Sequence, residues 1–285
     1  MKKVIKILFI IVSVLMPASI ISIWVSYNWL TVSVFTVDSS KISEPFRIVM
    51  ISDLHEHNFD KKNEKLTGKI REQSPDLVIL DGDMINRDSE NADAVIELID
   101  ALKKIALVYY SFGNHEISYV EVGHEAFHRE LEDAGAIVLN YQSVDVEVNG
   151  NAIRLGGLYE YGFETDMQSA EANERAVSYL KEFVDTNRYF IMCAHRPESF
   201  YPWNAADTWG IDLVLSGHLH GGQVILPGVG GLYNSLEGFF PEYDYGQYKQ
   251  GNSDLIISRG LGSNPKILPR CNNPPEIVVV DVLPE

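Results

Sequence analysis

Short apolar runs rich in β-branched residues recur along this chain, and amphipathic patterns lie between the first three of them. Apolar residues three and four positions apart, such as Val95, Leu98 and Ile99, predict a helix. We expect helices over residues 61–73 and 89–104. The predicted strands cover residues 46–52, 77–80, 107–112, 136–139, 189–194 and 211–216. Strands that alternate with helices indicate an α/β fold.

Other strands are joined by turns in place of helices. Two alternating runs, residues 144–148 and 152–158, flank the sequence Asn-Gly-Asn, which predicts a β-hairpin. Residues 254–260 and 276–282 also form apolar runs without a helical pattern between them. We therefore expect an α/β fold of two packed mixed β-sheets flanked by helices, as one domain over residues 46–285.

Residues 7–37 contain no charged side chain, and Lys2, Lys3 and Lys6 lie immediately before this segment. An apolar run of about 20 residues is enough to cross a bilayer. Basic residues ahead of such a run favour a cytoplasmic amino terminus. We expect residues 1–37 to form an N-terminal membrane anchor that contains a transmembrane helix. Residues 38–45 would form a linker to the domain. The catalytic domain would then lie on the outer face of the cell membrane. The alternative is a signal sequence whose cleavage releases a secreted protein.

The chain is strongly acidic, with a formal net charge of −17 at pH 7. Such a surface repels the phosphates of nucleic acid, so we exclude nucleic acid as a partner. The two cysteines, Cys193 and Cys271, are too few for a disulfide-built scaffold. Cys193 lies in an apolar run, which predicts a buried and inert thiol.

Residues of the types that bind metals follow the predicted strands. They are Asp53, His55, Asp81, Asp83, Asn114, His115, His195, His218 and His220. The carboxyl ends of strands in an open α/β sheet meet at one edge, so we expect these side chains to converge. In extended backbone, side chains two positions apart point the same way. We therefore expect Asp53 with His55, and likewise His218 with His220, to project in pairs toward a site for two cations.

A second metal-binding pattern competes with this interpretation. His124, Glu125 and His128 match the HExxH motif of zinc peptidases. That site needs a third protein ligand, and the later histidines fit better at the strand ends. Residues 122–135 also fit an ordinary helix whose buried stripe is Phe127, Leu131 and Ala134. We therefore reject a zinc peptidase.

The motifs SDLH, DGD, GNHE, AH and SGHLHGGQ occur in this order along the chain. Together they resemble the calcineurin-like metallophosphoesterase superfamily, from about residue 46 to the carboxyl terminus. The expected anchor, followed by a compact domain with few insertions, looks most like the bacterial membrane-associated branch of this superfamily. That branch includes enzymes that act on phospholipid head groups or UDP-diacylglucosamine. Glu116 stands where many relatives have aspartate, outside the expected ligand set.

Position by position, the resemblance implies two divalent metal ions. The first would be held by Asp53, His55, Asp83 and His220. The second would be held by Asp83, Asn114, His195 and His218, so that Asp83 bridges the two ions. The catalytic histidine corresponds to His115. A hydroxide that bridges the metals would attack phosphorus, while His115 steadies the developing charge or protonates the leaving oxygen. Oxygen and imidazole ligands suit manganese, iron, zinc or magnesium.

We thus expect a membrane-anchored phosphodiesterase or pyrophosphatase whose phosphoester substrate is lipid-linked or a nucleotide-sugar. The alternatives are a phosphomonoesterase on small phosphates, or a metal-binding module of this fold without turnover. The aromatic segment at residues 233–248 predicts either an apolar wall for the substrate or packing beneath the second sheet. We expect His57 outside the ligand set, and Arg196 either on substrate phosphate or in an ion pair.

Overall fold

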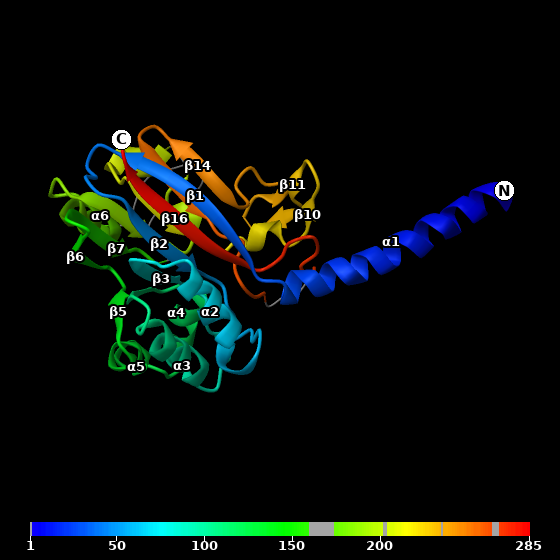
Figure 1. The fold of residues 1–285 in the computed structure, drawn as a ribbon, viewed down its shortest axis with the longest axis horizontal. Helices are drawn as coiled ribbons and strands as arrows, with labels where there is room; N and C mark the ends of the chain where they lie inside the picture. Colours follow the sequence, from blue (N-terminus) through cyan, green and yellow to red (C-terminus); the bar gives the residue numbers. More distant parts are fainter. Residues whose placement is uncertain (1, 160–173, 202–203, 235, 264–267) are drawn as a thin grey trace.

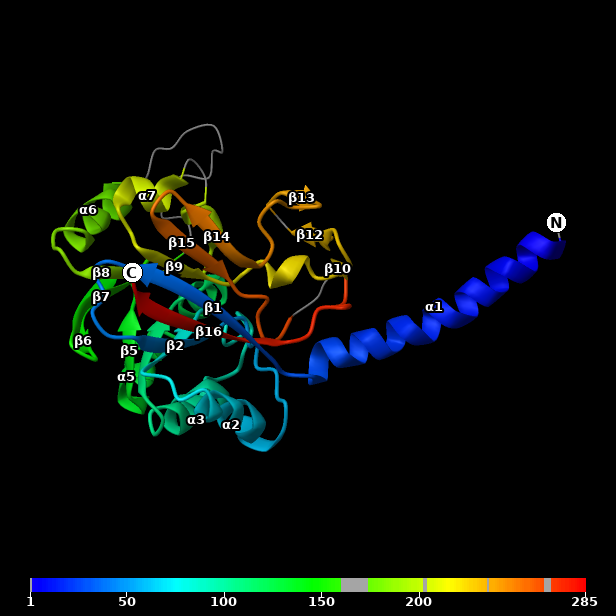
Figure 2. The same ribbon diagram turned by 45° about the horizontal axis from the view of Figure 1, so that its top comes forward.

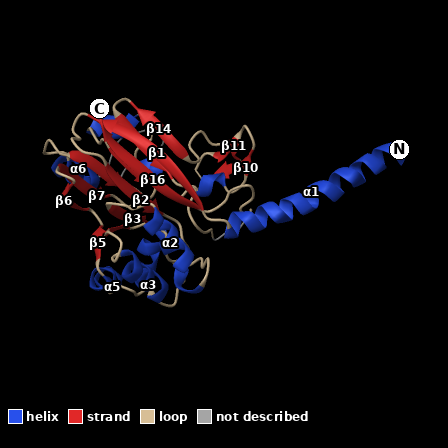
Figure 3. Ribbon diagram, in the orientation of Figure 1, coloured by secondary structure: helices blue, strands red, loops and turns tan. Residues whose placement is uncertain are grey.

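Two six-stranded sheets stack face to face in the computed structural model, with helices on the two outer faces (Figures 1 and 2). The structure describes residues 2–159, 174–201, 204–234, 236–263 and 268–285. Helices and strands alternate along the first half of the chain, as Figure 3 shows. The predicted architecture of mixed sheets flanked by helices is therefore confirmed.

The first sheet combines parallel and antiparallel pairs. In spatial order its strands are β1 (Thr31–Ser39), β16 (Glu276–Pro284), β2 (Phe46–Ile51), β3 (Leu77–Asp81), β4 (Leu107–Ser111) and β5 (Ala136–Leu139). Strands β2 to β5 run parallel, whereas β16 is antiparallel to β2. The outer face is covered by α2 (Glu64–Glu72), α3 (Asp93–Leu102), α4 (Asn114–Glu121) and α5 (Phe127–Ala134).

The second sheet is built in the same mixed way. In spatial order its strands are β14 (Gly246–Gln250), β15 (Ser253–Ile257), β9 (Leu213–Ser216), β8 (Tyr189–Cys193), β7 (Asn151–Gly157) and β6 (Gln142–Val148). The predicted hairpin is confirmed, because β6 and β7 pair antiparallel across the turn between Val148 and Asn151. Helices α6 (Glu174–Phe183) and α7 (Ala205–Trp209) cover its outer face.

The main core lies between the two sheets. Alternate residues of each strand point to opposite faces, so Ile79 of β3 joins the inter-sheet cluster while Val78 and Leu80 pack under the helices. Ile191 of β8 and Leu215 of β9 meet this cluster from the second sheet. Each such fully buried aliphatic side chain contributes about 1.5–3 kcal/mol to folding. This packing fixes the loops at the strand ends in both sheets relative to each other.

A small lobe follows β9 and carries much of the aromatic segment. It contains β10 (Ile225–Leu226), β11 (Gly230–Gly231), β12 (Tyr233–Asn234) and β13 (Gly238–Phe239). Tyr243 stacks on Tyr201 with ring centroids 4.3 Å apart, which supports the packing interpretation for this part of the segment. Phe239 and Phe240 differ, because they are 66% and 60% exposed.

The amino terminus forms α1 (Lys2–Asn28), which projects away from the domain (Figure 1). Among the residues described, no helix has the length and apolar character that a membrane crossing requires. The predicted transmembrane helix is therefore unconfirmed.

The boundary between anchor and domain also differs from the expected one. Residues 31–37, expected in the anchor, lie in β1, and residues 38–39 of the expected linker complete that strand beside β16. The reason is that an apolar, β-branched run such as this one has the composition of a buried strand as well as of a membrane segment.

Candidate metal centre

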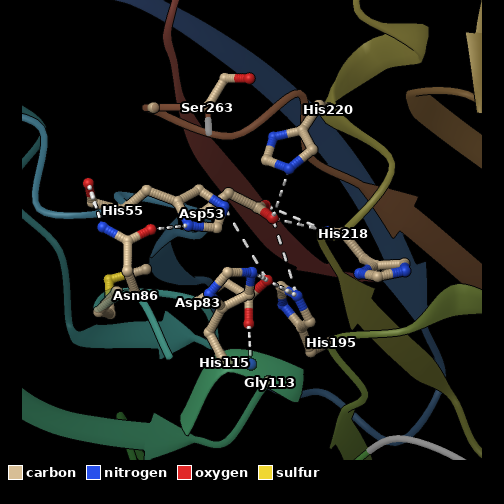
Figure 4. A network of polar contacts seen from close by, with 12 residues as sticks. Asp53, His55, Asp83, Asn86, Gly113, His115, His195, His218, His220 and Ser263 are labelled. Carbon is tan, nitrogen blue, oxygen red and sulfur yellow. Dashed lines mark hydrogen bonds and ion pairs between the residues drawn. The ribbon is translucent and has the colours of Figure 1, made fainter. Parts of the chain in front are cut away.

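The predicted ligands come together at the carboxyl ends of five strands, three in the first sheet (β2, β3 and β4) and two in the second (β8 and β9) (Figure 4). Asp53 and His55 follow β2, and Asp83 follows β3. His195 follows β8, and the segment from His218 to His220 follows β9. The site therefore lies across the gap between the two sheets, at the edge that the sequence predicts.

Among the described residues, three overlapping groups of side chains have ligand atoms close enough to hold a metal ion. Within each group the ligand atoms lie within 4.8 Å of one another. The groups are Asp53 with His55 and His220, then His55 with Asp83 and His115, and then Asp83 with His195 and His218. The first and the third correspond to the two ligand sets that the resemblance implies, apart from Asn114 and from Asp83 in the first set.

Asp83 lies at the centre of these groups. Its Oδ2 is 3.2 Å from Nε2 of His195 and 3.9 Å from Nε2 of His55. One carboxylate thus faces histidines that belong to both ligand sets. This position fits the bridging role that the resemblance implies for Asp83.

Hydrogen bonds to the far side of two histidine rings set the direction of their lone pairs. Nδ1 of His195 lies 2.6 Å from the carbonyl oxygen of Asp81, which can only accept, so Nδ1 carries the proton. Nδ1 of His55 similarly meets Oδ1 of Asn86 at 3.1 Å. In the neutral form of both rings Nε2 is then the buried acceptor, and neither Nε2 has a hydrogen-bond partner among the described residues. Oriented, unpartnered imidazole nitrogens are what a metal ion requires.

The charges of the site favour a cation. Burial alone would raise the pKa of Asp83, but His195 holds it well below its usual value. Burial would lower the pKa of His195, but Asp83 and Asp53 raise it well above its usual value. The carboxylates of Asp53 and Asp83 therefore stabilise positive charge between them. A divalent metal ion bound there would supply that charge. Burial also lowers the pKa of His55 to about 4, so this ring is neutral and free to bind a metal at pH 7.

The backbone at the ligands corrects one prediction. Five of the ligand residues have a positive φ, which is uncommon outside glycine: Asp53 (51°), His55 (48°), Asp83 (52°), His218 (69°) and His220 (49°). They are therefore not in extended backbone, and the expected projection in pairs is wrong for His218 and His220. His218 groups with Asp83 and His195, whereas His220 groups with Asp53 and His55. Strain of this kind persists only where the surroundings enforce it, and it concentrates at functional sites.

Two glycines allow the ligand loops to approach each other. A Cβ atom on Gly113 would lie 2.4 Å from Oδ1 of Asp83, and one on Gly217 would lie 2.5 Å from Oδ2 of Asp53. Side chains do not tolerate contacts this short. Any residue larger than glycine would displace a carboxylate of the site.

Helix α4 begins at the site with Asn114 and His115. Oδ1 of Asn114 is buried without a hydrogen-bond partner in the described part of the chain, so it is free to bind a cation. The backbone N–H of His115 donates to Oδ1 of Asp83 at 2.8 Å, and Nδ1 of His115 accepts from the backbone N–H of Arg87 at 3.1 Å. The His115 side chain is 18% exposed, so this ring borders the open side of the site.

Glu116 has a structural role that the motif alone did not reveal. It is fully buried, and its two oxygens accept four hydrogen bonds of 2.8–2.9 Å. The donors are the backbone N–H groups of Asp83, Met84 and Gly113 and the hydroxyl of Tyr110. Glu116 therefore ties the Asp83 loop to the start of α4. The only sequence signal was an acidic residue next to His115.

The other candidates lie outside the ligand groups. Asp81 is fully buried, and both of its carboxylate oxygens are without a hydrogen-bond partner among the described residues. His57 packs against Phe59, with ring centroids 4.6 Å apart, as expected for a residue outside the ligand set. Arg196 forms an ion pair with Glu198, and both side chains are buried.

The HExxH residues do not form a zinc site. His124 precedes α5 and stacks on Tyr119 with ring centroids 3.8 Å apart. His128 lies on α5, where Nε2 is 3.4 Å from Oε1 of Glu132. The two imidazoles are therefore not on one helix, and Phe127, Leu131 and Ala134 form the predicted buried stripe.

Comparison with known proteins agrees with this geometry. Residues 46–222 match the family of calcineurin-like phosphoesterases, so the chain belongs to that family and is a phosphoester hydrolase. It is 30% identical to YpbG of Bacillus subtilis over 257 residues, which cover 89% of this chain and 87% of YpbG. It is 25% identical to the metallophosphoesterase YkoQ of Bacillus subtilis over 83% of this chain and 87% of YkoQ. It is 28% identical to the phosphodiesterase YaeI of Escherichia coli over 84% of this chain and 83% of YaeI.

Proposed function

We propose that this protein is a phosphodiesterase or pyrophosphatase that depends on two divalent metal ions. The observation that carries the proposal is the position of Asp83, whose carboxylate faces His55 on one side and His195 on the other. The similarity to YaeI, which is named a phosphodiesterase, supports the diester as the substrate class.

The residues present fit two metal ions. One ion would be held by Asp53, His55, Asp83 and His220. The other would be held by Asp83, Asn114, His195 and His218. When bound, such ions supply positive charge for the phosphoryl oxygens and lower the pKa of a water molecule toward neutrality. Manganese, iron, zinc and magnesium all suit this mixture of oxygen and imidazole ligands.

His115 would act on the oxygens of the substrate. Because Nδ1 accepts the backbone N–H of Arg87, the proton of the neutral ring is on Nε2. Nε2 points into the site, 3.9 Å from Oδ2 of Asp83. An N–H at this place donates a hydrogen bond to a phosphoryl or leaving oxygen and stabilises the charge that develops there. This geometry favours stabilisation of charge over transfer of the proton.

The substrate is proposed to carry an apolar group, either lipid-linked or part of a nucleotide-sugar. The exposed rings of Phe239 and Phe240 support this: they lie with ring centroids 6.5 Å apart, and contiguous exposed apolar surface is typical of binding sites. Replacing both by alanine should lower activity on a lipid phosphodiester and leave activity on bis-p-nitrophenyl phosphate unchanged. Equal loss on both substrates, or on neither, would remove the support for an apolar substrate.

The location of the protein is a further part of the proposal. Lys2, Lys3 and Lys6 precede the uncharged segment, which supports a cytoplasmic amino terminus with the domain on the outer face of the cell membrane. Secretion after cleavage is the alternative. Protease added to intact cells should degrade the domain in the first case, whereas the culture medium should contain it in the second. A domain protected from protease in intact cells would contradict both.

A phosphomonoesterase on small phosphates is the second candidate, since the same centre can cleave both kinds of ester. A metal-binding module without turnover is the third. Bis-p-nitrophenyl phosphate and p-nitrophenyl phosphate, each with manganese and each repeated after chelation, separate them. Activity on the diester alone supports the proposal, activity on the monoester alone supports the second candidate, and activity on neither supports the third.

A further inference from the structure

The carboxyl-terminal end of α1 lies against the segment that leads into β16. Ser22 and Ser26 are four positions apart, so they share one face of the helix. The hydroxyl of Ser26 accepts the backbone N–H of Asn273 at 3.0 Å, and the hydroxyl of Ser22 accepts the backbone N–H of Asn272 at 2.7 Å. Ser26 and Asn273 are both fully buried. This part of α1 therefore packs as part of the domain.

The side chain of Asn273 connects α1 to the proposed metal ligand His220. Its side-chain Nδ2 donates to the carbonyl oxygen of His220 at 2.7 Å and to that of Gln223 at 3.2 Å. Nδ2 of Asn272 donates to the carbonyl oxygen of Ile225 at 2.9 Å. Two adjacent asparagines thus hold the chain from His220 to Ile225 on one side and α1 on the other.

The segment from His220 to Gln223 has an unusual backbone conformation. His220 and Gln223 have φ values of 49° and 61°, and the two glycines between them are also left-handed. Gln223 N–H donates to the His220 carbonyl within this turn at 3.1 Å. Non-glycine residues with a positive φ are strained, and such strain persists only where the surroundings enforce it. The hydrogen bonds from Asn273 are therefore part of what keeps the His220 backbone in place.

A buried arginine fixes the orientation of Asn273. Arg270 is fully buried, and its Nε donates to the carbonyl oxygen of Asn273 at 3.0 Å. Its Nη2 also donates to Oδ1 of Asn273 at 3.2 Å. Because Oδ1 faces a guanidinium, the amide of Asn273 must direct Nδ2 at His220.

From these contacts we propose that the last two turns of α1 belong to the scaffold of the metal centre, with Ser26 and Asn273 as positioning residues for His220. Ser26 acts through Asn273, and Asn273 acts on the His220 carbonyl. The inference rests on the proposed function in one respect, because it takes His220 to be a metal ligand. It assigns α1 a role in the site in addition to any role in location.

The test uses the full-length chain and manganese as the probe. Asn273→Asp keeps the shape of the side chain but places an oxygen against the two carbonyl groups. Ser26→Ala removes the hydroxyl acceptor. Ser19→Ala is the matched control, because Ser19 is an exposed serine on the same helix. Manganese affinity is read from the free-ion electron paramagnetic resonance signal, together with kcat and KM for bis-p-nitrophenyl phosphate.

We expect Asn273→Asp to weaken manganese binding about tenfold or more, since a buried donor is replaced by an acceptor. Ser26→Ala should weaken it less, and the double variant should bind no worse than Asn273→Asp alone. The control should match the parent. The number of manganese ions bound at saturation should be the same in all variants, whereas a general loss of folded protein would lower that number.

Two results would overturn the inference. The first is that Ser26→Ala binds manganese with the same affinity as the parent. This comparison does not need Asn273→Asp, so it tests the inference even if that variant does not fold. The other is full additivity in the double variant, because independent effects mean that Ser26 does not act through Asn273. Failure of the parent to hydrolyse any phosphoester would instead contradict the proposed function, and the manganese titrations would still test the link from α1 to His220.

Discussion

Oδ2 of Asp83 lies 3.2 Å from Nε2 of His195, although the two residues follow strands of different sheets. Asp83 follows β3 in the first sheet, and His195 follows β8 in the second. The apolar core between the sheets sets the distance between these strands. The geometry of the candidate centre therefore depends on the packing of the whole domain.

Replacement of Asp83 by alanine should abolish hydrolysis of bis-p-nitrophenyl phosphate. The reason is that Asp83 is the carboxylate shared by the two proposed ligand sets, so its loss weakens both. Metal analysis by mass spectrometry should show less than one manganese ion retained per chain. A variant with near-native activity would exclude the proposed role of Asp83.

Glu116→Gln should weaken manganese binding by roughly 10- to 100-fold, because each buried donor left unpaired costs about 1–3 kcal/mol. The glutamine side chain has one oxygen and one NH₂ group. In either orientation the NH₂ group faces backbone N–H groups that now donate to Glu116. Calorimetric titration with manganese measures the effect.

Tyr110→Phe is the control for Glu116→Gln, because it removes only one of the four donors and leaves the carboxylate in place. It should bind manganese within a few-fold of the parent. Equal losses in the two variants would mean that Glu116 contributes to general stability and does not specifically hold the Asp83 loop.

The strands and the convergence of the site could be predicted from local patterns. Strands β2, β3 and β8 are short apolar runs followed at once by polar ligands, and the carboxyl ends of such strands meet at one edge. The backbone of the ligands could not be predicted. The left-handed conformations of Asp53 and His220 depend on hydrogen bonds from distant segments, and no local pattern encodes those bonds.

Two further features escaped prediction for the same physical reason. Strand β1 has the composition of a membrane segment, and only its pairing with β16 distinguishes the two. The four donors around Glu116 come from three separate loops and strands, so its role depends on the tertiary structure. By contrast, the stripe of Phe127 and Leu131 was predictable, because it follows the helical period alone.

Gly217→Ala should lower kcat at least about tenfold, since a Cβ atom there would lie 2.5 Å from Oδ2 of Asp53 and would displace this carboxylate. Gly68→Ala is the matched control. Gly68 lies in α2, and a Cβ atom on it would meet no other atom within 4 Å. The control should keep its activity and gain up to about 1 kcal/mol of stability. Unchanged kinetics in Gly217→Ala would show that the close approach is not required.

Asp81→Asn should change how stability depends on pH. Burial raises the pKa of Asp81 to about 8, far above the value of about 3.9 for an unfolded chain. The folded parent therefore binds this proton more tightly than the unfolded chain does. Its stability should fall as pH rises from about 4 to about 8, by at most about 1.4 kcal/mol per pH unit from this group.

The asparagine variant lacks this titration, so its stability relative to the parent should rise across the same window and level off above pH 8. Urea unfolding of both proteins in the presence of a chelator, at pH 5, 6, 7 and 8, measures the difference. Parallel pH profiles for the two proteins would show that Asp81 titrates normally.

The rate of bis-p-nitrophenyl phosphate hydrolysis during titration of chelator-treated protein with manganese tests the central claim most directly. The account predicts no turnover before manganese is added, a rate that rises with each addition, and saturation near two ions per chain. Hydrolysis that is unaffected by chelation, or its absence at every manganese concentration, would contradict a dinuclear metal centre built around Asp83.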